Sequence, residues 1–189
     1  MKTTLNQIRE KSPCPSGWKR LLASLQKTSS DDESLSIVTI LNSNGVVDAI
    51  WCLQAVEGRT KEISLFGVWC ARQVQHLMTD QRSIDAVDVA ERFANGEASH
   101  EEIAAARDAA WAARAEACAD TSAAAWAAHD AAEAAAWAGA GAAAARFAGE
   151  AAAGTFAGAA AARSAGAASQ EQRLRELCAE CDAESKDAA

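Results

Sequence analysis

The side chains that could support chemistry in this 189-residue chain are its six cysteines and three histidines. Cys178 and Cys181 form a CxxC pair, but a zinc site needs four ligands and no second pair or histidine lies nearby in sequence. A redox CxxC begins a helix after a strand, and this one does not. The histidines have no carboxylate or nucleophile at a recognisable spacing: they are His76, His100 and His129. We therefore expect structural thiols, no metal, no cofactor and no enzyme activity.

Two tryptophan–cysteine pairs stand in apolar stretches, Trp51–Cys52 and Trp69–Cys70. Tryptophan and free cysteine are both frequently buried in folded domains. We interpret the two pairs as core packing, and a ligand pocket is the alternative. No phosphate-binding loop accompanies them, because Gly139 and Gly141 lie in an alanine run and not between a strand and a helix.

Charge is unevenly distributed along the chain. The net charge of −8 and the pI of about 4.9 argue against nonspecific binding to nucleic acid. Residues 1–30 are basic, and we interpret their cations as a solvated helix face: Arg9, Lys11, Lys19, Arg20 and Lys27. An acidic band in the middle of the chain is either another solvated face or a surface that meets a basic protein. It comprises Asp80, Asp85, Asp88, Glu91, Glu97, Glu101 and Glu102.

The first residues and the apolar stretches bear on the cellular compartment that we expect for the protein. Residues 1–11 are mostly polar and lack the apolar segment of a signal peptide. The longest weakly apolar stretch is alanine and glycine with charges inside it, which is not a membrane span. We expect a cytoplasmic protein with reduced thiols and no membrane partner.

Turn residues divide the first half of the chain into short amphipathic helices. Strand signals are nearly missing, since the one β-branched run, residues 34–41, can continue as a buried helix. Phe66, Trp69 and Val74 belong to a set of apolar residues at helical spacing. In chain order the expected helices are a short one before Pro13, 18–26, one from 29–31 to 42–45, 46–56 closed by Gly58, 60–78, and 80–93 closed by Gly96.

Alanine dominates the second half: 38 of the chain's roughly 50 alanines fall between Ala104 and Ala168. Alanine is the best helix former, so this low-complexity sequence still predicts helices. Ser99 and Glu102 form a capping box that begins this half. Breaks are expected at 120–122 and 139–141, and an ordinary polar helix at 170–183. The later glycines either cost about 1 kcal/mol each or permit close helix approach: Gly149, Gly154, Gly158 and Gly166.

The other side chains of this half fall on one side of the helix. At about 100° per residue, every residue in 122–138 that is not alanine lies within about 60° of Trp126. A looser version surrounds Trp111, with Glu116 and Asp120 off its side. Unpaired carboxylates are costly to bury, so we expect alanine inside and this mixed face outside, the reverse of the usual order. We call it the tryptophan stripe: Arg107, Trp111, Arg114, Trp126, His129, Asp130, Glu133 and Trp137.

Two interpretations of the tryptophan stripe stay open. Tryptophan among polar groups is a frequent binding hot spot, which makes the stripe a candidate surface for a partner or ligand. Alternatively, the indoles simply cover neighbouring alanine, and the acids beside them provide solubility. The first interpretation places the tentative binding residues on the stripe, and the second gives it no partner.

Several stretches, in order, resemble the alanine-rich immunity proteins of bacteria and phages. They are Cys14 followed by Gly17–Trp18, DAIWCL from Asp48, LFGVWCARQV from Leu65, DQRSIDAVDVAERFANGEAS from Asp80, and the long alanine run. The resemblance covers roughly residues 14–168, and 65–99 is its most distinctive part. It implies an all-helical, non-enzymatic protein that neutralises a toxin by binding it, and it supplies no catalytic residues. The chain departs from the family by using tryptophan where tyrosine is frequent and by carrying more glycine after residue 138.

Together these observations predict an all-α, multi-helix bundle with a closely packed, alanine-rich C-terminal half. Residues 1–98 form the amphipathic region and 99–189 the alanine-rich region of one continuous domain, with a first core around Trp51, Phe66, Trp69, Val74 and Leu77. The expected function is immunity or counter-defence by occluding a toxin or defence protein. One alternative is a small-molecule binder, with indoles on a nucleotide-like ligand and Arg107 or Arg114 on its phosphate. The other is a structural homo-oligomer.

Overall fold

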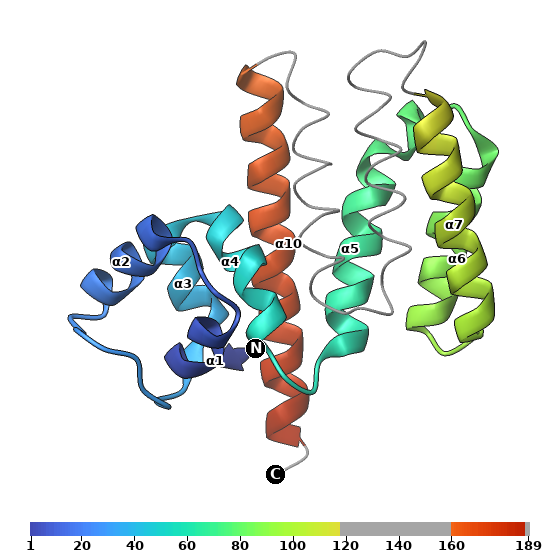
Figure 1. Cartoon of the computed structure of the whole chain (residues 1–189). Coiled ribbons are helices and arrows are strands. Elements are labelled where there is room, and N and C mark those ends of the chain that lie inside the picture. The colour runs from blue at the N-terminus through green and yellow to red at the C-terminus, as the bar shows by residue number, and fades with distance from the viewer. Residues whose placement is uncertain (118–159, 188–189) are drawn as a thin grey trace. The chain divides into compact units, whose positions relative to one another are not determined.

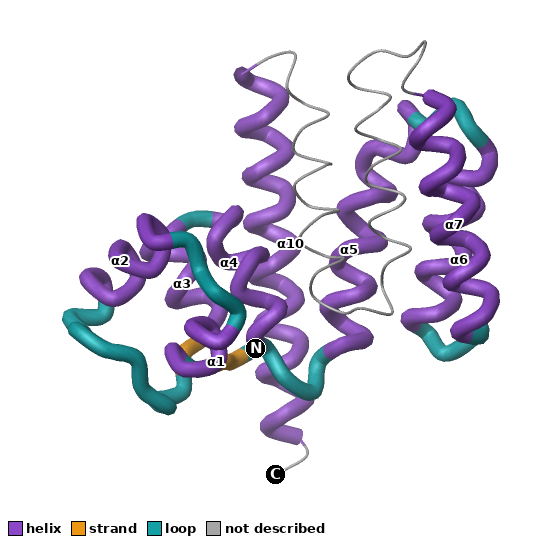
Figure 2. Tube along the Cα trace, viewed as in Figure 1, coloured by secondary structure: helices purple, strands orange, loops and turns teal. Residues whose placement is uncertain are grey.

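The computed structural model describes residues 1–117 and 160–187 and confirms the all-α, multi-helix class. Within these residues the strands are one short antiparallel pair, β1 (Lys2–Thr3) and β2 (Leu35–Ser36), in which Thr3 faces Leu35 (Figures 1 and 2). The chain divides into two compact units, Met1–Arg59 with Glu171–Ala189, and Thr60–Gln170. These bounds differ from the change in composition at residue 98. No helix of the described ranges has both the length and the apolar character needed to cross a bilayer.

The first unit is a cluster of short helices closed by the end of a long one. It contains α1 (Leu5–Glu10), α2 (Pro15–Ser24), α3 (Ile37–Asn44), α4 (Val46–Cys52), the 3₁₀ turn η1 (Leu53–Ala55) and the C-terminal part of α10 (Ala160–Asp187). Its core consists of aliphatic side chains from each of these helices, which bury their apolar faces together. They include Leu5, Ile8, Leu21, Ile37, Ile40, Ile50, Leu53, Leu174 and Leu177.

Helix α3 begins later than its sequence suggested. The expected start at 29–31 is wrong, because the Asp31 carboxylate instead accepts hydrogen bonds from Lys27 Nζ at 2.6 Å and from the Glu33 N–H at 3.2 Å. The helix begins at Ile37, where Ser36 Oγ accepts from the Val38 N–H. An equally good capping residue thus ends β2, and the chain uses that one.

Helices α2 and α4 also differ from expectation at their ends. Helix α2 begins at Pro15, because Cys14 caps it and proline is well suited to the first helical position. Helix α4 ends at Cys52, and the expected continuation to residue 56 tightens into η1 before a loop. Gly58 lies in that loop with φ +71°, a conformation that glycine adopts readily.

The second unit has a conventional core between α5 (Thr60–Val74) and α6 (Gln81–Ala94), linked by the 3₁₀ turn η2 (Gln75–Leu77). Helix α7 (His100–Ala117) packs against α6. The expected capping box is confirmed: the Glu102 N–H donates to Ser99 Oγ at 3.1 Å, and the Ser99 N–H donates to Glu102 Oε2 at 2.8 Å. Fully buried side chains here are Ile63, Phe66, Cys70, Val74, Ala86, Val87 and Ala90.

The sequence identified part of this core correctly. Phe66 and Val74 are buried, whereas Trp51, Trp69 and Leu77 are only half-buried. Leu77 lies in η2 and not on the continuing helical face that its spacing predicted. Trp69 stacks on Phe66 with ring centroids 6.1 Å apart, so its indole covers the core from one side.

The buried cysteines behave as packing residues. Desolvation raises the pKa of Cys52 and of Cys70 to about 12, and that of Cys178 to about 11. Cys178 and Cys181 are both buried free thiols on α10. Thiols with raised pKa values are poor nucleophiles at neutral pH. This agrees with the interpretation of the CxxC pair as structural.

Candidate functional site

Helix α7 carries the one part of the tryptophan stripe whose surroundings the structure describes. The Trp111 side chain is 58% exposed, while the adjacent Ala110 and nearby Ala113 are fully buried together with Ile103. The small alanine side chains let this face of α7 pack closely on its neighbours. The expected inversion, with alanine inside and indole outside, is therefore confirmed at Trp111.

The other stripe residues are not brought together by the described structure. Arg107 is half-buried and donates to Asp108 on the same helix, with its Nη2 3.0 Å from Oδ1. Arg114 belongs to α7, but its side chain is outside the described part of the chain. The remaining five positions also lie outside the described residues: Trp126, His129, Asp130, Glu133 and Trp137.

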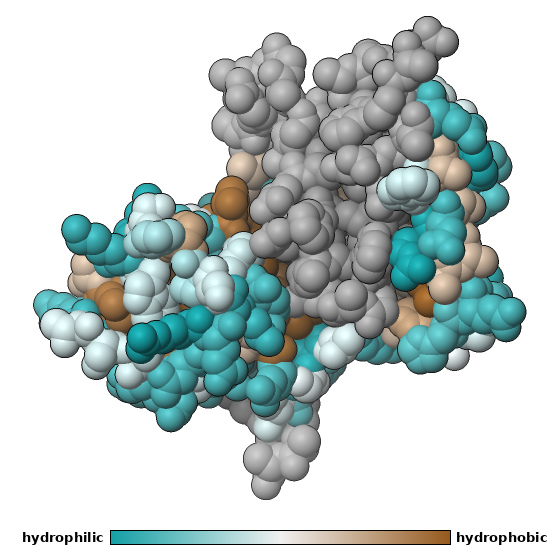
Figure 3. Space-filling model, viewed as in Figure 1, coloured by the Kyte–Doolittle hydropathy of each residue, from teal (hydrophilic) through white to brown (hydrophobic). Residues whose placement is uncertain are grey.

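Several carboxylates of the acidic band are neutralised by arginines, which the composition alone did not indicate. Three arginines on α5 and α6 form ion pairs with four acids of the band and with Glu116 on α7. The pairs are Arg72 with Asp88 and Glu91, Arg82 with Asp80 and Glu116, and Arg92 with Glu102. The pKa of Glu102 is lowered first by the Ser99 N–H and then by Arg92. Much of the band is therefore a network that links α5, α6 and α7. On the face shown in Figure 3 the described residues are mainly hydrophilic, with apolar areas among them.

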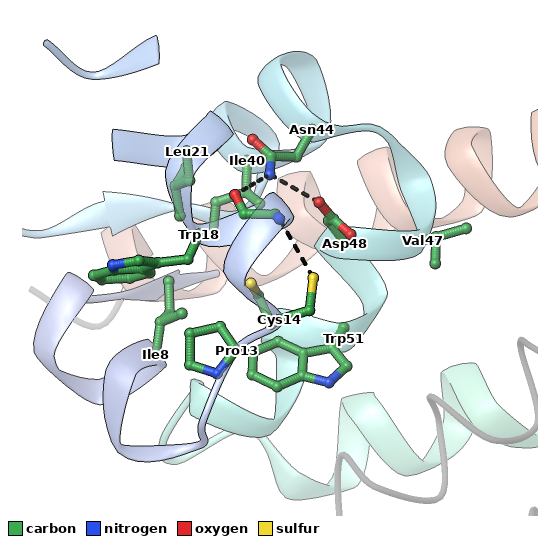
Figure 4. Close-up of a pocket in the computed structure, with 12 residues that line it drawn as sticks. Ile8, Pro13, Cys14, Trp18, Leu21, Ile40, Asn44, Val47, Asp48 and Trp51 are labelled. Carbon is green, nitrogen blue, oxygen red and sulfur yellow. Dashed lines mark hydrogen bonds between the residues drawn. The ribbon is translucent and has the colours of Figure 1, made fainter. Parts of the chain in front are cut away.

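A pocket in the first unit is a second candidate site (Figure 4). Its volume is about 190 Å³, and it lies among α1, α2, α3 and α4. Most of the wall is apolar, and the indoles of Trp18 and Trp51 come from two different helices. The lining residues are Ile8, Pro13, Cys14, Gly17, Trp18, Leu21, Ile40, Asn44, Val47, Asp48, Trp51 and Cys52.

Gly17 holds the polar end of this pocket together. Its N–H donates to Cys14 Sγ at 3.3 Å, and its carbonyl oxygen accepts from Asn44 Nδ2 at 2.9 Å. The same amide nitrogen of Asn44 donates to Asp48 Oδ2 at 2.8 Å. A Cβ atom at position 17 would stand 2.9 Å from that carboxylate oxygen and 3.0 Å from the sulfur. A larger residue at position 17 would therefore displace the carboxylate or the thiol from the first turn of α2.

Cys14 differs chemically from the buried cysteines. It is exposed, and the pKa of its thiol is lowered by hydrogen bonds with Ser16 and with the Gly17 N–H. A lowered pKa increases the thiolate fraction and so the reactivity of the sulfur. Among the cysteines that the structure describes, Cys14 is the exposed one. It is thus a natural chemical reporter for this pocket.

The sequence pointed to parts of this pocket without assembling them. Cys52 is buried, as core packing predicts, and both Trp51 and Cys52 line this pocket, whose use as a ligand site stays a prediction. Cys14, Gly17 and Trp18 belong to stretches quoted for the family resemblance. Asn44 and Asp48 were not identified as site residues, because helix α2 and strand β2 separate them from Cys14 in the chain. A usable signal was the run Cys14-Pro15-Ser16-Gly17, a capping residue followed by proline.

Comparison of the chain with models of protein families, with curated proteins and with solved structures finds no match.

Proposed function

We propose that this protein is a non-enzymatic binding protein that occludes another protein, in toxin immunity or counter-defence. The observation that carries the proposal is the exposure of the Trp111 indole on a helix that buries the neighbouring Ala110 and Ala113. The resemblance of residues 14–168 to alanine-rich immunity proteins gives the proposal its biological setting. Occlusion needs a complementary surface and no reacting group.

Trp111 is well placed to act as a hot spot for a partner. Tryptophan is among the residues that contribute most when an interface buries them. Its helix is held to α6 by packing and by the Arg82–Glu116 ion pair, so the indole is presented on a supported element. The net charge of −8 favours a basic partner through long-range attraction. A standard interface of about 1,600 Å² in total would extend well beyond Trp111.

The test begins with site-specific crosslinking in cells that contain the native partner. A photoreactive phenylalanine analogue is placed at position 111, at Ala105 on the same helix, and at Val47, an exposed apolar residue of the other unit. We expect a crosslinked protein of defined mass at position 111 and none at position 47. The crosslinked protein is identified and purified, and its affinity is measured for wild type and Trp111→Ala.

The expected result is a loss of at least about tenfold in affinity for Trp111→Ala, with an unchanged circular dichroism spectrum. Val47→Ala serves as the matched control and should bind like wild type. Equal affinity for wild type and Trp111→Ala would overturn the proposal. So would light scattering that shows a concentration-dependent oligomer abolished by Trp111→Ala, because the surface would then serve self-association.

A further inference from the structure

The pocket of the first unit has the size of a single ring with a short substituent. An apolar protein cavity of about 150 Å³ is known to accommodate a benzene molecule. The present pocket measures about 190 Å³ and is mostly walled by indole and aliphatic groups (Figure 4). Its interior therefore suits an aromatic or compact aliphatic group.

The polar end of the pocket carries the negative charge of Asp48. Asp48 is half-buried, and its Oδ2 accepts from Asn44 Nδ2. Within the described residues Asp48 forms no ion pair, and the nearby Arg20 donates instead to the backbone oxygen of Asn44 at 3.3 Å. A partly desolvated carboxylate is stabilised by a cation that replaces its lost hydration. A phosphate or carboxylate ligand would be repelled here.

The two aromatic walls favour the same charge. Trp18 on α2 and Trp51 on α4 both line the pocket, on different sides of Cys14 (Figure 4). An indole packs favourably against another aromatic ring, and its face also attracts a cation held nearby. Shape, wall chemistry and charge thus specify one kind of occupant.

We propose that this pocket binds a small aromatic amine, with its ring against the indole and aliphatic wall and its ammonium group on the Asp48 carboxylate. Gly17 serves the site by letting Asp48 and Asn44 approach the first turn of α2. Cys14 lies in the same wall, so an occupant shields its sulfur. This site belongs to α1–α4 and does not depend on a role for Trp111.

The test measures protection of Cys14 from iodoacetamide, which alkylates the sulfur with loss of iodide and release of the thiol proton. Mass spectrometry of the Cys14 peptide separates this reaction from labelling at any other cysteine. Three probes share one ring and differ in charge: 2-phenylethylamine, 2-phenylethanol and 3-phenylpropionate. We expect the amine to protect Cys14 at about tenfold lower concentration than the alcohol, with no protection by the carboxylate.

Asp48→Asn is the decisive variant, because it keeps the shape of the side chain and removes its charge. It should reduce protection by the amine to the level of the alcohol. Asp85→Asn, which removes the same charge from an exposed position of α6, should leave protection unchanged. Equal protection by all three probes, no protection by the amine, or the same amine preference in Asp48→Asn would overturn the proposal.

A second variant keeps the test informative if Asp48→Asn does not fold. Trp18→Leu keeps the carboxylate and removes one aromatic wall, so it should weaken protection by the amine and by the alcohol. The indole N–H resonances of Trp18 and Trp51, assigned by substitution, give an independent reading. Both should shift on addition of the amine to wild type, and the absence of any shift would contradict binding in this pocket.

Discussion

Helices α5 and α7 of the same unit bury opposite kinds of residue. In α5 an aromatic side chain, Phe66, is 2% exposed, and Trp69 stacks on it. In α7 the buried positions next to the aromatic are Ala110 and Ala113, and Trp111 itself is 58% exposed. The contrast shows that whether a large apolar side chain is buried depends on the other residues on the same face of its helix. Around Trp111 that face includes Arg107 and Asp108, which favour solvent.

The two packing modes have different energetics. A buried phenylalanine contributes a large transfer free energy, and its removal leaves a cavity. A buried alanine contributes little by transfer but allows close backbone approach at almost no cost in side-chain entropy. Helix α7 should therefore tolerate the loss of side-chain atoms from its exposed face. Atoms added to its buried face should lower the free energy of unfolding. The predictions below test this contrast.

Phe66→Ala should produce the largest effect, a loss of about 3–5 kcal/mol in the free energy of unfolding, because it empties the centre of the α5–α6 core. Chemical denaturation followed by circular dichroism measures it. Phe66→Leu keeps most of the volume and should cost less than about 1.5 kcal/mol. Similar small losses for both variants would show that this core is not conventionally packed.

Ala110→Leu should cost about 1–3 kcal/mol, because Ala110 is fully buried and a longer side chain would have to displace its neighbours. The matched control is Ala105→Leu on the exposed side of the same helix, which should change stability by no more than about 0.5 kcal/mol. Equal tolerance at both positions would mean that the alanine face of α7 is not tightly packed.

Ser99→Ala should cost about 1 kcal/mol, because it removes the hydroxyl that caps α7. The pH dependence of stability tests Glu102, the other residue of the capping box. The pKa of Glu102 is lowered in the folded protein, so its stabilisation is present above the unfolded value of about 4.3 and disappears as the pH falls through the folded value. Thermal melts from pH 6 to pH 3 should show a smaller acid loss for Glu102→Gln than for wild type. Glu101→Gln controls for the removal of one charge; matching curves for wild type and Glu102→Gln would contradict the prediction.

Trp111→Ala should have the smallest effect, within about 0.5 kcal/mol of wild type, because the side chain is mostly exposed and alanine is the better helix former. The same denaturation experiment as for Phe66→Ala makes the comparison direct. A loss comparable to that of Phe66→Ala would place Trp111 in a core and remove it as a binding residue.

The sequence predicted the features that depend on local chemistry. Helical periodicity and turn residues predicted the all-α class. Ser99 and Glu102 predicted the start of α7. Charge beside Trp111 correctly predicted its exposure. Choices between competing local signals were harder, as at α3, where Ser36 is the cap and the earlier Asp31 forms a turn.

The pocket could not be derived in the same way, because its residues come from several helices. Asp48 meets Gly17 because α2 and α4 both pack against α3, an arrangement that no spacing in the chain encodes. The WC pairs illustrate the same limit. Equal in sequence, they differ in the structure: Trp51 lines a pocket and Trp69 stacks on Phe66. The local sequence pattern predicts that both cysteines are buried. What each indole contacts depends on tertiary packing.

The most direct test of the inverted packing on α7 is the solvent exposure of the Trp111 indole in the folded protein. The protein is labelled with 5-fluorotryptophan, the ¹⁹F resonance of position 111 is assigned with Trp111→Phe, and its shift between H₂O and D₂O is measured. We expect a solvent-isotope shift for position 111 close to that of free 5-fluorotryptophan and larger than the shift for half-buried Trp69. A negligible shift at position 111 would show the indole sealed from water and would contradict the account.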